Sequence, residues 1–229
     1  MTPQQVHFYT KLTEFLGRAL GPDYEVAFHD LTDSNRSLVA ISNNHISGRD
    51  IGAPLTNVAL KIIADRSYQT SDYRTHYRGM SIDGRILRCS TMFIKDANNE
   101  LVGLLCINFD DSRYQELSEK ILELCHPDVF VESNFLFDSD RVPLRPSTED
   151  TESFHNSIDD VAGNAVGDVL RDMGVTAERL THEEKMAVVG KLDARGVFLL
   201  KGAVRDVARA LCCSPASVYR YLSKLRNEP

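Results

Sequence analysis

The chain has 229 residues, of which 42% are hydrophobic and 26% charged, an ordinary globular composition that suffices for one medium domain and one small one. The N-terminal residues lack the basic start and apolar run of a signal peptide, and no stretch approaches the roughly 18 apolar residues of a membrane span. The five cysteines form no CxxC pair and suit reduced thiols. We therefore expect a soluble, cytoplasmic protein that folds without disulfides, a metal or another cofactor.

The charge is distributed unevenly along the chain, whose formal net charge is −7. From Arg195 to Pro229, seven Lys or Arg residues oppose two acidic ones, which gives a local charge of +5 and leaves −12 for the remainder. A basic C-terminal segment on an acidic body is the pattern expected when only one module contacts a polyanion.

The N-terminal half has the pattern of an α+β domain. Apolar residues at three- and four-residue steps predict a helix over the first twenty residues, which Gly21 and Pro22 end. Turn residues and alternating apolar positions then predict a five-stranded antiparallel sheet, with a helix over Leu55–Asp65 inserted after the second strand. The expected strands are Tyr24–Leu31, Ser37–Asn43, Thr75–Ser81, Ile86–Lys95 and Glu100–Phe109.

A boundary between two domains is predicted after residue 125. Asp111–Leu124 has a helical pattern, and the stretch that follows brings three prolines among acidic and Ser/Thr residues, which is typical of a linker. We expect an N-terminal domain over residues 1–125, a linker over 126–152 and an all-α C-terminal domain over 153–229. A long helix is predicted over Asp150–Gly174, and three roles are open for it. It connects the domains, pairs with its copy in a dimer, or packs on its own domain. Thr181 begins a shorter helix, which Gly196 ends.

The segment VRDVARALCCSPASVYRYLSKL, Val204–Leu225, has the pattern of a helix-turn-helix. Ala208 is the small residue needed where the second helix crosses the first, and apolar residues on both sides of the turn keep helical spacing. Ser214 is a good N-cap, and Pro215 suits the first helical position. Cys212 stands where glycine is commonest, so we expect a slightly different turn.

The second helix of such a motif enters the major groove of DNA with its N-terminal and central turns. Arg220 is the candidate for base reading, because arginine pairs bidentately with guanine, whereas the hydroxyl groups and Lys224 suit phosphates. The alternative is a three-helix bundle in which these side chains form a solvated face, which the local positive charge disfavours. The predicted DNA-binding residues are Ser214, Ala216, Ser217, Tyr219, Arg220 and Lys224.

The sequence also resembles a known family. FLLKGAVRDVARALCCSPASVYRYL is similar to the C-terminal signature of the YheO-like family, whose members join a PAS domain to a helix-turn-helix. EVAFHDL, ISNNHISGRDIGAPLTN, GRILRCSTMFIKD and LVGLLCINFD resemble that family's PAS portion. The resemblance implies a transcriptional regulator that binds a double-stranded DNA operator. The family's best-described type represses D-arginine utilisation genes, which implies a repressor controlled by a small molecule such as an amino acid.

A PAS-like sheet curls around a cleft, so polar residues that face inward are the candidate ligand contacts. Arg49 is suited to clamp a carboxylate, and Asp30 or Asp50 to receive an ammonium or guanidinium group. Ser90 and Thr91 lie on opposite faces of one strand, so at most one of them faces inward. Five candidates also have a purely structural interpretation: Asn43 and Asn108 satisfy backbone groups at strand ends, His29 and His45 are core or capping residues, and Arg49 pairs with Asp50 or a helix terminus. The candidates are His29, Asp30, Asn43, His45, Arg49, Ser90, Cys106 and Asn108.

Two other functions match parts of the sequence. His29, Asp30 and either Ser90 or Cys106 are residue types used in acyl transfer, but no GxSxG elbow, phosphate-binding glycine loop or zinc signature surrounds them. We therefore expect no enzyme and no metal site. The second alternative is a PAS-like domain that only dimerises and binds no small molecule. Because one helix-turn-helix reads only a half-site, we expect a homodimer.

Overall fold

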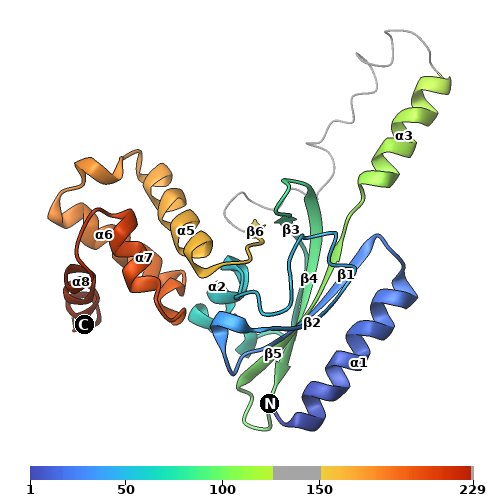
Figure 1. The fold of residues 1–229 in the computed structure, drawn as a ribbon, viewed down its shortest axis with the longest axis horizontal. Coiled ribbons are helices and arrows are strands. Elements are labelled where there is room, and N and C mark those ends of the chain that lie inside the picture. The colour runs from blue at the N-terminus through green and yellow to red at the C-terminus, as the bar shows by residue number, and fades with distance from the viewer. Residues whose placement is uncertain (126–150, 228–229) are drawn as a thin grey trace.

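The fold is a mixed β-sheet with one helix on one face and a group of helices on the other (Figure 1). The computed structural model describes residues 1–125 and 151–227. Helix α1 (Pro3–Leu20) covers one face, whereas α2 (Asn57–Asp65) and the C-terminal helices lie on the opposite side. Helix α3 (Ser112–Cys125) extends away from the sheet, and none of its residues is buried. None of the helices in the described ranges has the length and apolar character that a membrane span needs.

The sheet has six strands in the order β2-β1-β5-β4-β3-β6. The five predicted strands are present, antiparallel to one another, and within two residues of their expected ends. The predicted number of strands is wrong, because β6 (Glu152–Ser153) adds a sixth strand, parallel to β3. A strand of two residues is too short to show an alternating pattern. The other strands are β1 (Tyr24–Asp30), β2 (Leu38–Ser42), β3 (Tyr73–Met80), β4 (Ile86–Lys95) and β5 (Leu101–Phe109).

Alternation along the strands gives the sheet two apolar faces. On β4, Leu87 and Cys89 are buried on the side of α2, whereas Arg88 between them is exposed. On β1, Phe28 points the other way and stacks on Tyr9 of α1, with ring centroids 5.3 Å apart. Polar groups enclosed between the sheet and α2 are shielded from water and therefore need partners inside the protein.

Side-chain caps fix the starts of the helices. Thr2 and Gln5 form a capping box at α1, in which each side chain accepts a hydrogen bond from the other residue's backbone amide. Thr181 and Glu184 form the same arrangement at α6 (His182–Ala194). The helix start predicted at Thr181 is confirmed.

Helix α5 (Ile158–Met173) is shorter than the helix predicted over Asp150–Gly174. Glu152 and Ser153, ahead of this helix, enter the sheet as β6. Ser157 then caps α5, because its Oγ accepts the amide of Asp160 at 3.2 Å. The apolar spacing of the sequence located the helix but did not show that the chain first pairs with β3.

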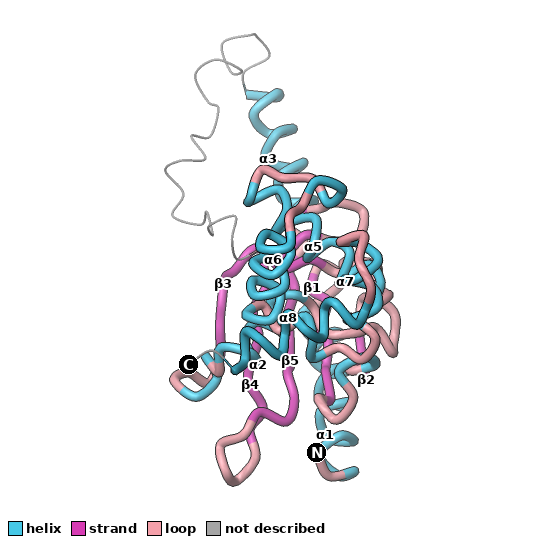
Figure 2. Tube along the Cα trace, turned by 90° about the vertical axis from the view of Figure 1, so that its left-hand side faces the viewer, coloured by secondary structure: helices cyan, strands magenta, loops and turns pink. Residues whose placement is uncertain are grey.

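Helices α5 to α8 form one compact group, the helical part (residues 158–227), which packs on α2 (Figure 2). Its last two helices are α7 (Ala203–Ala210) and α8 (Pro215–Asn227). A Cβ built on Gly196 would lie 2.6 Å from the carbonyl oxygen of Leu60, so α2 touches the backbone there. The Asn35 side chain exchanges two hydrogen bonds of 2.9 Å with the backbone of Lys201. One hydrophobic core therefore runs from the sheet through α2 into the helical part.

Candidate functional site

The C-terminal helices α7 and α8 form the predicted helix-turn-helix. Ala208 is only 1% exposed, and its carbonyl oxygen accepts the amide of Cys213 at 2.9 Å. Ser214 caps α8, because its Oγ accepts the amide of Ser217 at 3.2 Å. Cys212 adopts the left-handed conformation itself, with φ at 49°. The turn thus has the backbone shape that glycine usually supplies, rather than the altered turn expected from the sequence.

Helix α8 lies at the outer end of the helical part (Figure 1). Its polar face is exposed to solvent. Tyr219 is 62% exposed, and the exposed Arg220 donates from Nη2 to Ser217 Oγ at 3.3 Å. Val218 and Tyr221 are buried on the opposite side, where α8 packs on α6 and α7. The six residues predicted to contact DNA are all exposed except Ser217, which is half-buried. The N-terminus of α8, which is the positive end of the helix dipole and attracts phosphate, is exposed together with these residues.

A second polar cluster lies inside the N-terminal part, on the α2 side of the sheet. Glu25 of β1 is fully buried, and its Oε2 accepts the hydroxyl and the amide of Ser47 at 2.6 and 3.1 Å. Asn108 of β5 donates from Nδ2 to Glu25 Oε1 at 2.8 Å. Burial raises the pKa of Glu25, and these hydrogen bonds oppose that shift. Asn108 Oδ1 has no hydrogen-bond partner among the described residues.

The buried Arg49 lies close to this carboxylate. Its Nη2 donates to the carbonyl of Pro54 at 2.5 Å, and its Nη1 lies 3.5 Å from His29 Nε2. Because arginine can only donate, His29 Nε2 acts as the acceptor and its Nδ1 carries the proton toward Ser37 Oγ, 2.9 Å away. Burial, and then the charge of Arg49, lower the pKa of His29 well below its ordinary value, so His29 is neutral at physiological pH.

Strand β6 supplies a further buried carboxylate to the same face. Glu152 is 3% exposed, and its Oε1 accepts the hydroxyl of Thr56 at 2.6 Å. The hydroxyls of Tyr77 and Thr91 lie 2.8 Å apart, and Thr91 donates to Cys106 Sγ at 3.2 Å. The space among these side chains is about 10 Å³, which is room for one water. The interior site comprises Glu25, His29, Arg49, Thr56, Tyr77, Thr91, Cys106, Asn108 and Glu152.

The structure brings four of the eight predicted ligand contacts together in the interior site: His29, Arg49, Cys106 and Asn108. It places Asn43 and His45 at the rim instead. The Asn43 amide donates to three backbone carbonyls at 2.8 to 3.1 Å, which ties the end of α1 to β1. The exposed His45 lies with Nε2 3.1 Å from the carbonyl of Pro22. Both side chains therefore contact backbone carbonyl oxygens, which agrees with their structural interpretation.

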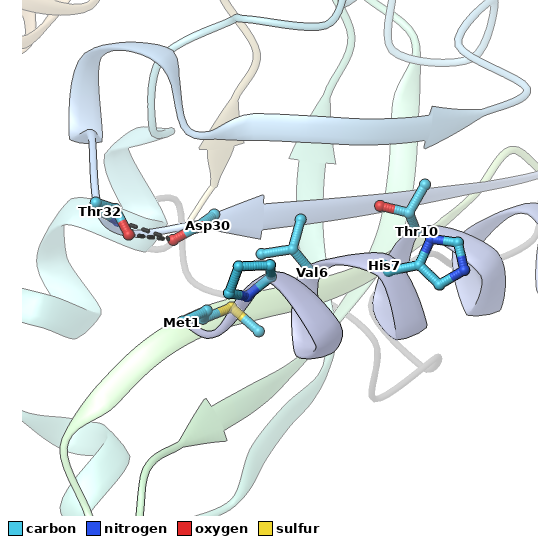
Figure 3. Close-up of a pocket in the computed structure, with 7 residues that line it drawn as sticks. Met1, Val6, His7, Thr10, Asp30 and Thr32 are labelled. Atoms are coloured by element: carbon cyan, nitrogen blue, oxygen red, sulfur yellow. Dashed lines mark hydrogen bonds between the residues drawn. The ribbon is translucent and has the colours of Figure 1, made fainter.

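Asp30 and Ser90 face away from the interior site. Asp30 lines a pocket beside the first turns of α1 (Figure 3), where its Oδ1 accepts the amide and hydroxyl of Thr32 at 3.0 and 2.7 Å. Ser90 Oγ accepts the amide of His76 at 3.2 Å on the outer face of β4. Thr91 is the inward member of the Ser90/Thr91 pair, a choice that alternation alone left open.

Sequence reasoning missed several members of the interior site. Glu25 shares a face with His29 by simple alternation along β1, so that signal was available. Thr56 has the position of an N-cap before an apolar helical run, and it does cap α2 by accepting the amide of Ala59 at 3.2 Å. Glu152 gave no signal, because its burial depends on a strand that only the folded chain reveals.

The residue types considered for acyl transfer are not assembled. His29 and Asp30 point to opposite faces of the sheet, and Ser90 lies on the outer face. Burial raises the pKa of Cys106 to about 12, so its thiol is not a nucleophile at neutral pH.

The sheet with its closed polar interior is the fold of a PAS-type domain. The helix-turn-helix that follows, with its second helix exposed, is of the type found in DNA-binding domains. Comparison with known families agrees with both halves. The family model of the YheO-like PAS domain matches residues 2–126, and an HTH domain model matches residues 161–223. The chain belongs to the YheO-like PAS domain family.

Curated relatives cover nearly the whole chain. "Uncharacterized protein YheO" of Escherichia coli K12 is 24% identical over 219 residues, which are 96% of this chain and 84% of that protein. An "Uncharacterized protein" of Haemophilus influenzae is 24% identical over 225 residues, 97% of this chain and 92% of its own length. "Transcriptional regulator DauR" of Pseudomonas aeruginosa is 25% identical over 232 residues, 99% of both chains.

Proposed function

We propose that the chain is a transcriptional regulator that binds a double-stranded DNA operator through α8. The observation that carries this proposal is the exposed polar face of α8, which begins at a capped turn and ends the helical part. The local charge of the C-terminal segment fits a polyanionic partner. A relative that matches this chain over its full length is named a transcriptional regulator.

We assign different roles to the residues of this exposed face. Arg220 is long, exposed and able to pair bidentately with guanine O6 and N7, so it is the base-reading residue. Ser217, Tyr219 and Lys224 hold phosphates and set the register of α8 in the groove. Ser214 and Ala216 lie at the N-terminal turn, where the backbone approaches the DNA most closely.

The regulator acts as a homodimer, because two half-sites double the contacts that one α8 makes. Helix α3 supports this proposal. Tyr114, Leu117, Ile121 and Leu124 are 51 to 84% exposed, and their steps of three and four residues are those of a heptad seam. A second copy of α3 is the occupant that this spacing suits. Replacing Leu117 and Ile121 with Glu should give a monomer in analytical ultracentrifugation at micromolar concentration.

A small molecule, of the amino-acid type, binds the interior site and controls operator binding. Buried polar atoms without a partner among the described residues support a ligand there: Arg49 Nε, Asn108 Oδ1 and Glu152 Oε2. An effector needs to favour one arrangement of the two domains by only about 1 to 3 kcal/mol to give a useful response. Repression is the proposed direction, on the resemblance to the family's best-described type.

A fluorescence-anisotropy titration against DNA from upstream of the chain's own gene tests the proposal, with and without D- and L-amino acids at fixed salt. Specific binding that an amino acid shifts supports the ligand-controlled regulator. The second candidate is a PAS-type domain that only dimerises, and the small interior space of about 10 Å³ favours it. Specific binding that no amino acid of the panel alters would support that candidate.

A further inference from the structure

The side chain of Glu152 enters the interior site from the segment that leads into the helical part. The residue is 3% exposed, although it belongs neither to the five antiparallel strands nor to α2. Thr56 Oγ1 donates to its Oε1 at 2.6 Å. A buried carboxylate is costly unless its surroundings compensate for the lost water, so these surroundings indicate which chemistry the site accepts.

The surroundings of the Glu152 carboxylate favour an anion. Thr56 is the N-cap of α2, so the positive end of the helix dipole lies beside the carboxylate. Burial raises the pKa of Glu152; the hydrogen bond from Thr56 and the charge of the buried Arg49 oppose that shift, and the side chains of Tyr77 and Cys89 oppose it further. Glu152 Oε2 and Arg49 Nε have no hydrogen-bond partner among the described residues. The carboxylate therefore lies beside a hydroxyl donor, a helix N-terminus and a guanidinium group. The hydrogen-bonding capacity of this group of side chains is not fully used.

The strand that carries Glu152 has a short ladder with its neighbour. Among the described residues, β6 pairs with β3 at the Gly79/Glu152 and Met80/Ser153 positions, and the amide of the buried Phe154 donates to the carbonyl of Met80 at 3.4 Å. Asn57 of α2 adds two hydrogen bonds of 2.8 Å, to the carbonyl of Thr151 and from the amide of Ser153. So short an edge strand can leave the sheet without disturbing the antiparallel strands.

The same segment leads directly to the DNA-binding end of the molecule. Asn156 donates to the carbonyl of Gly48 at 3.0 Å and accepts the amide of Asp50 at 3.2 Å, so it fastens the loop that carries Arg49. Helix α5 begins at Ile158 and packs against α6 and α7. Glu152 and the start of α5 therefore lie on one short segment, which Asn156 joins to the loop that carries Arg49.

We propose that Glu152 is an internal ligand, and that the effector is a small carboxylic acid whose carboxylate takes the place of Glu152 and displaces β6. This rests on the proposed function, because it names the effector's class and the route from the interior site to α8. The buried Arg49 sets the class, since a neutral molecule that expelled Glu152 would leave the guanidinium with one opposite charge fewer. The interior space of about 10 Å³ admits one water, so binding and displacement occur together.

Chemical rescue by acetate tests the anion site without DNA. Glu152→Ala removes the internal carboxylate and leaves its position to an added one. Acetate, at about ten times its dissociation constant, should raise the thermal midpoint of this variant by about 4 °C more than that of the wild type. Acetamide, the neutral isostere, should not. Glu119→Ala on the exposed α3 is the matched control and should respond as the wild type does. Equal acetate shifts in the variant and the wild type, or an equal shift with acetamide, would overturn the anion site.

The identity of the binding groups and the displacement of β6 have their own tests. Adding Thr56→Val to Glu152→Ala should weaken acetate binding about 10-fold, and an unchanged affinity would count against the α2 N-terminus. Without effector, Glu152→Ala should bind the operator with an affinity at least about 5-fold different from the wild type. A wild type that binds its operator specifically, with Glu152→Ala binding equally well, would leave the proposed function standing and overturn the displacement. No specific binding by the wild type would instead overturn the proposed function.

Discussion

Gly196→Ala tests the docking of the helical part on the PAS domain. Gly196 has φ at 74°, and a Cβ there would lie 2.6 Å from the carbonyl oxygen of Leu60 in α2. Gly174 is the matched control, because its φ is 66° and a Cβ there would meet nothing within 4 Å. Both substitutions place alanine in the left-handed region, and only the first also drives a methyl group into α2.

The structure gives the expected magnitudes. The left-handed conformation costs alanine about 1 kcal/mol relative to glycine, so Gly174→Ala should lower the free energy of unfolding by about that amount. The close approach at Gly196 adds about 1 to 3 kcal/mol, because the methyl group must push the helical part away from a backbone atom. The thermal midpoint should then fall by about 3 °C for Gly174→Ala and about 9 °C for Gly196→Ala.

Thermal and urea unfolding of the full chain measure this difference. One continuous core joins both parts, so we expect a single unfolding transition in each protein. Amide exchange locates the effect, since Gly196→Ala should speed exchange in α2 and Gly174→Ala should not. Equal losses of stability in the two variants, with α2 unchanged in both, would refute the docking of the helical part on α2.

Three further predictions follow from the two sites. Arg220→Ala should cost about 1 to 3 kcal/mol of operator binding and relax the base preference, whereas Lys224→Ala should mainly reduce the salt dependence of binding. Anisotropy titrations measure both effects, and identical salt and sequence dependence for the two variants would contradict the assigned roles. Burial holds the pKa of His29 below its ordinary 6.5, so below that pH the unfolded chain binds a proton that the folded chain does not. The stability that this residue contributes is therefore present above about pH 6.5 and is lost as the pH falls. In urea unfolding, the free energy of unfolding of His29→Gln should fall less between about pH 6.5 and 5 than that of the wild type. Iodoacetamide at pH 8 should label the exposed Cys125 in the folded protein and reach Cys106 only after unfolding, as peptide mass spectrometry would show; rapid labelling of native Cys106 would contradict its burial.

Local patterns in the sequence predicted most of the fold, because each pattern reflects a local cause. The bounds of β4, Ile86–Lys95, match the prediction, since turn residues flank a strand with clear alternation. Ser214 begins α8 as predicted, because an N-cap acts through its own neighbouring amides. Strand β6 depends on β3, which precedes it by some seventy residues in the sequence, so no local pattern revealed it.

The interior site was predicted only in part, for a related reason. Alternation fixes which residues share a face, but the position of α2 decides which face is enclosed. Cys106 and Asn108 were selected on the correct face of β5, whereas Ser90 was selected on β4 and Thr91 is the inward residue. The loop residue Arg49 was selected because an arginine is suited to clamp the carboxylate of a ligand, and the structure buries its side chain in the interior site.

Footprinting tests the central claim, that this chain reads a DNA operator through α8, most directly. The purified full chain is incubated with DNA from upstream of its own gene, with Arg220→Ala in parallel at the same salt. The account predicts two protected half-sites for the wild type, with centres about 10 base pairs, or a multiple of that, apart. Arg220→Ala should need about 5- to 150-fold more protein for the same protection, as its loss of about 1 to 3 kcal/mol implies. No protected region with the wild type, or the same protection with both proteins, would contradict it.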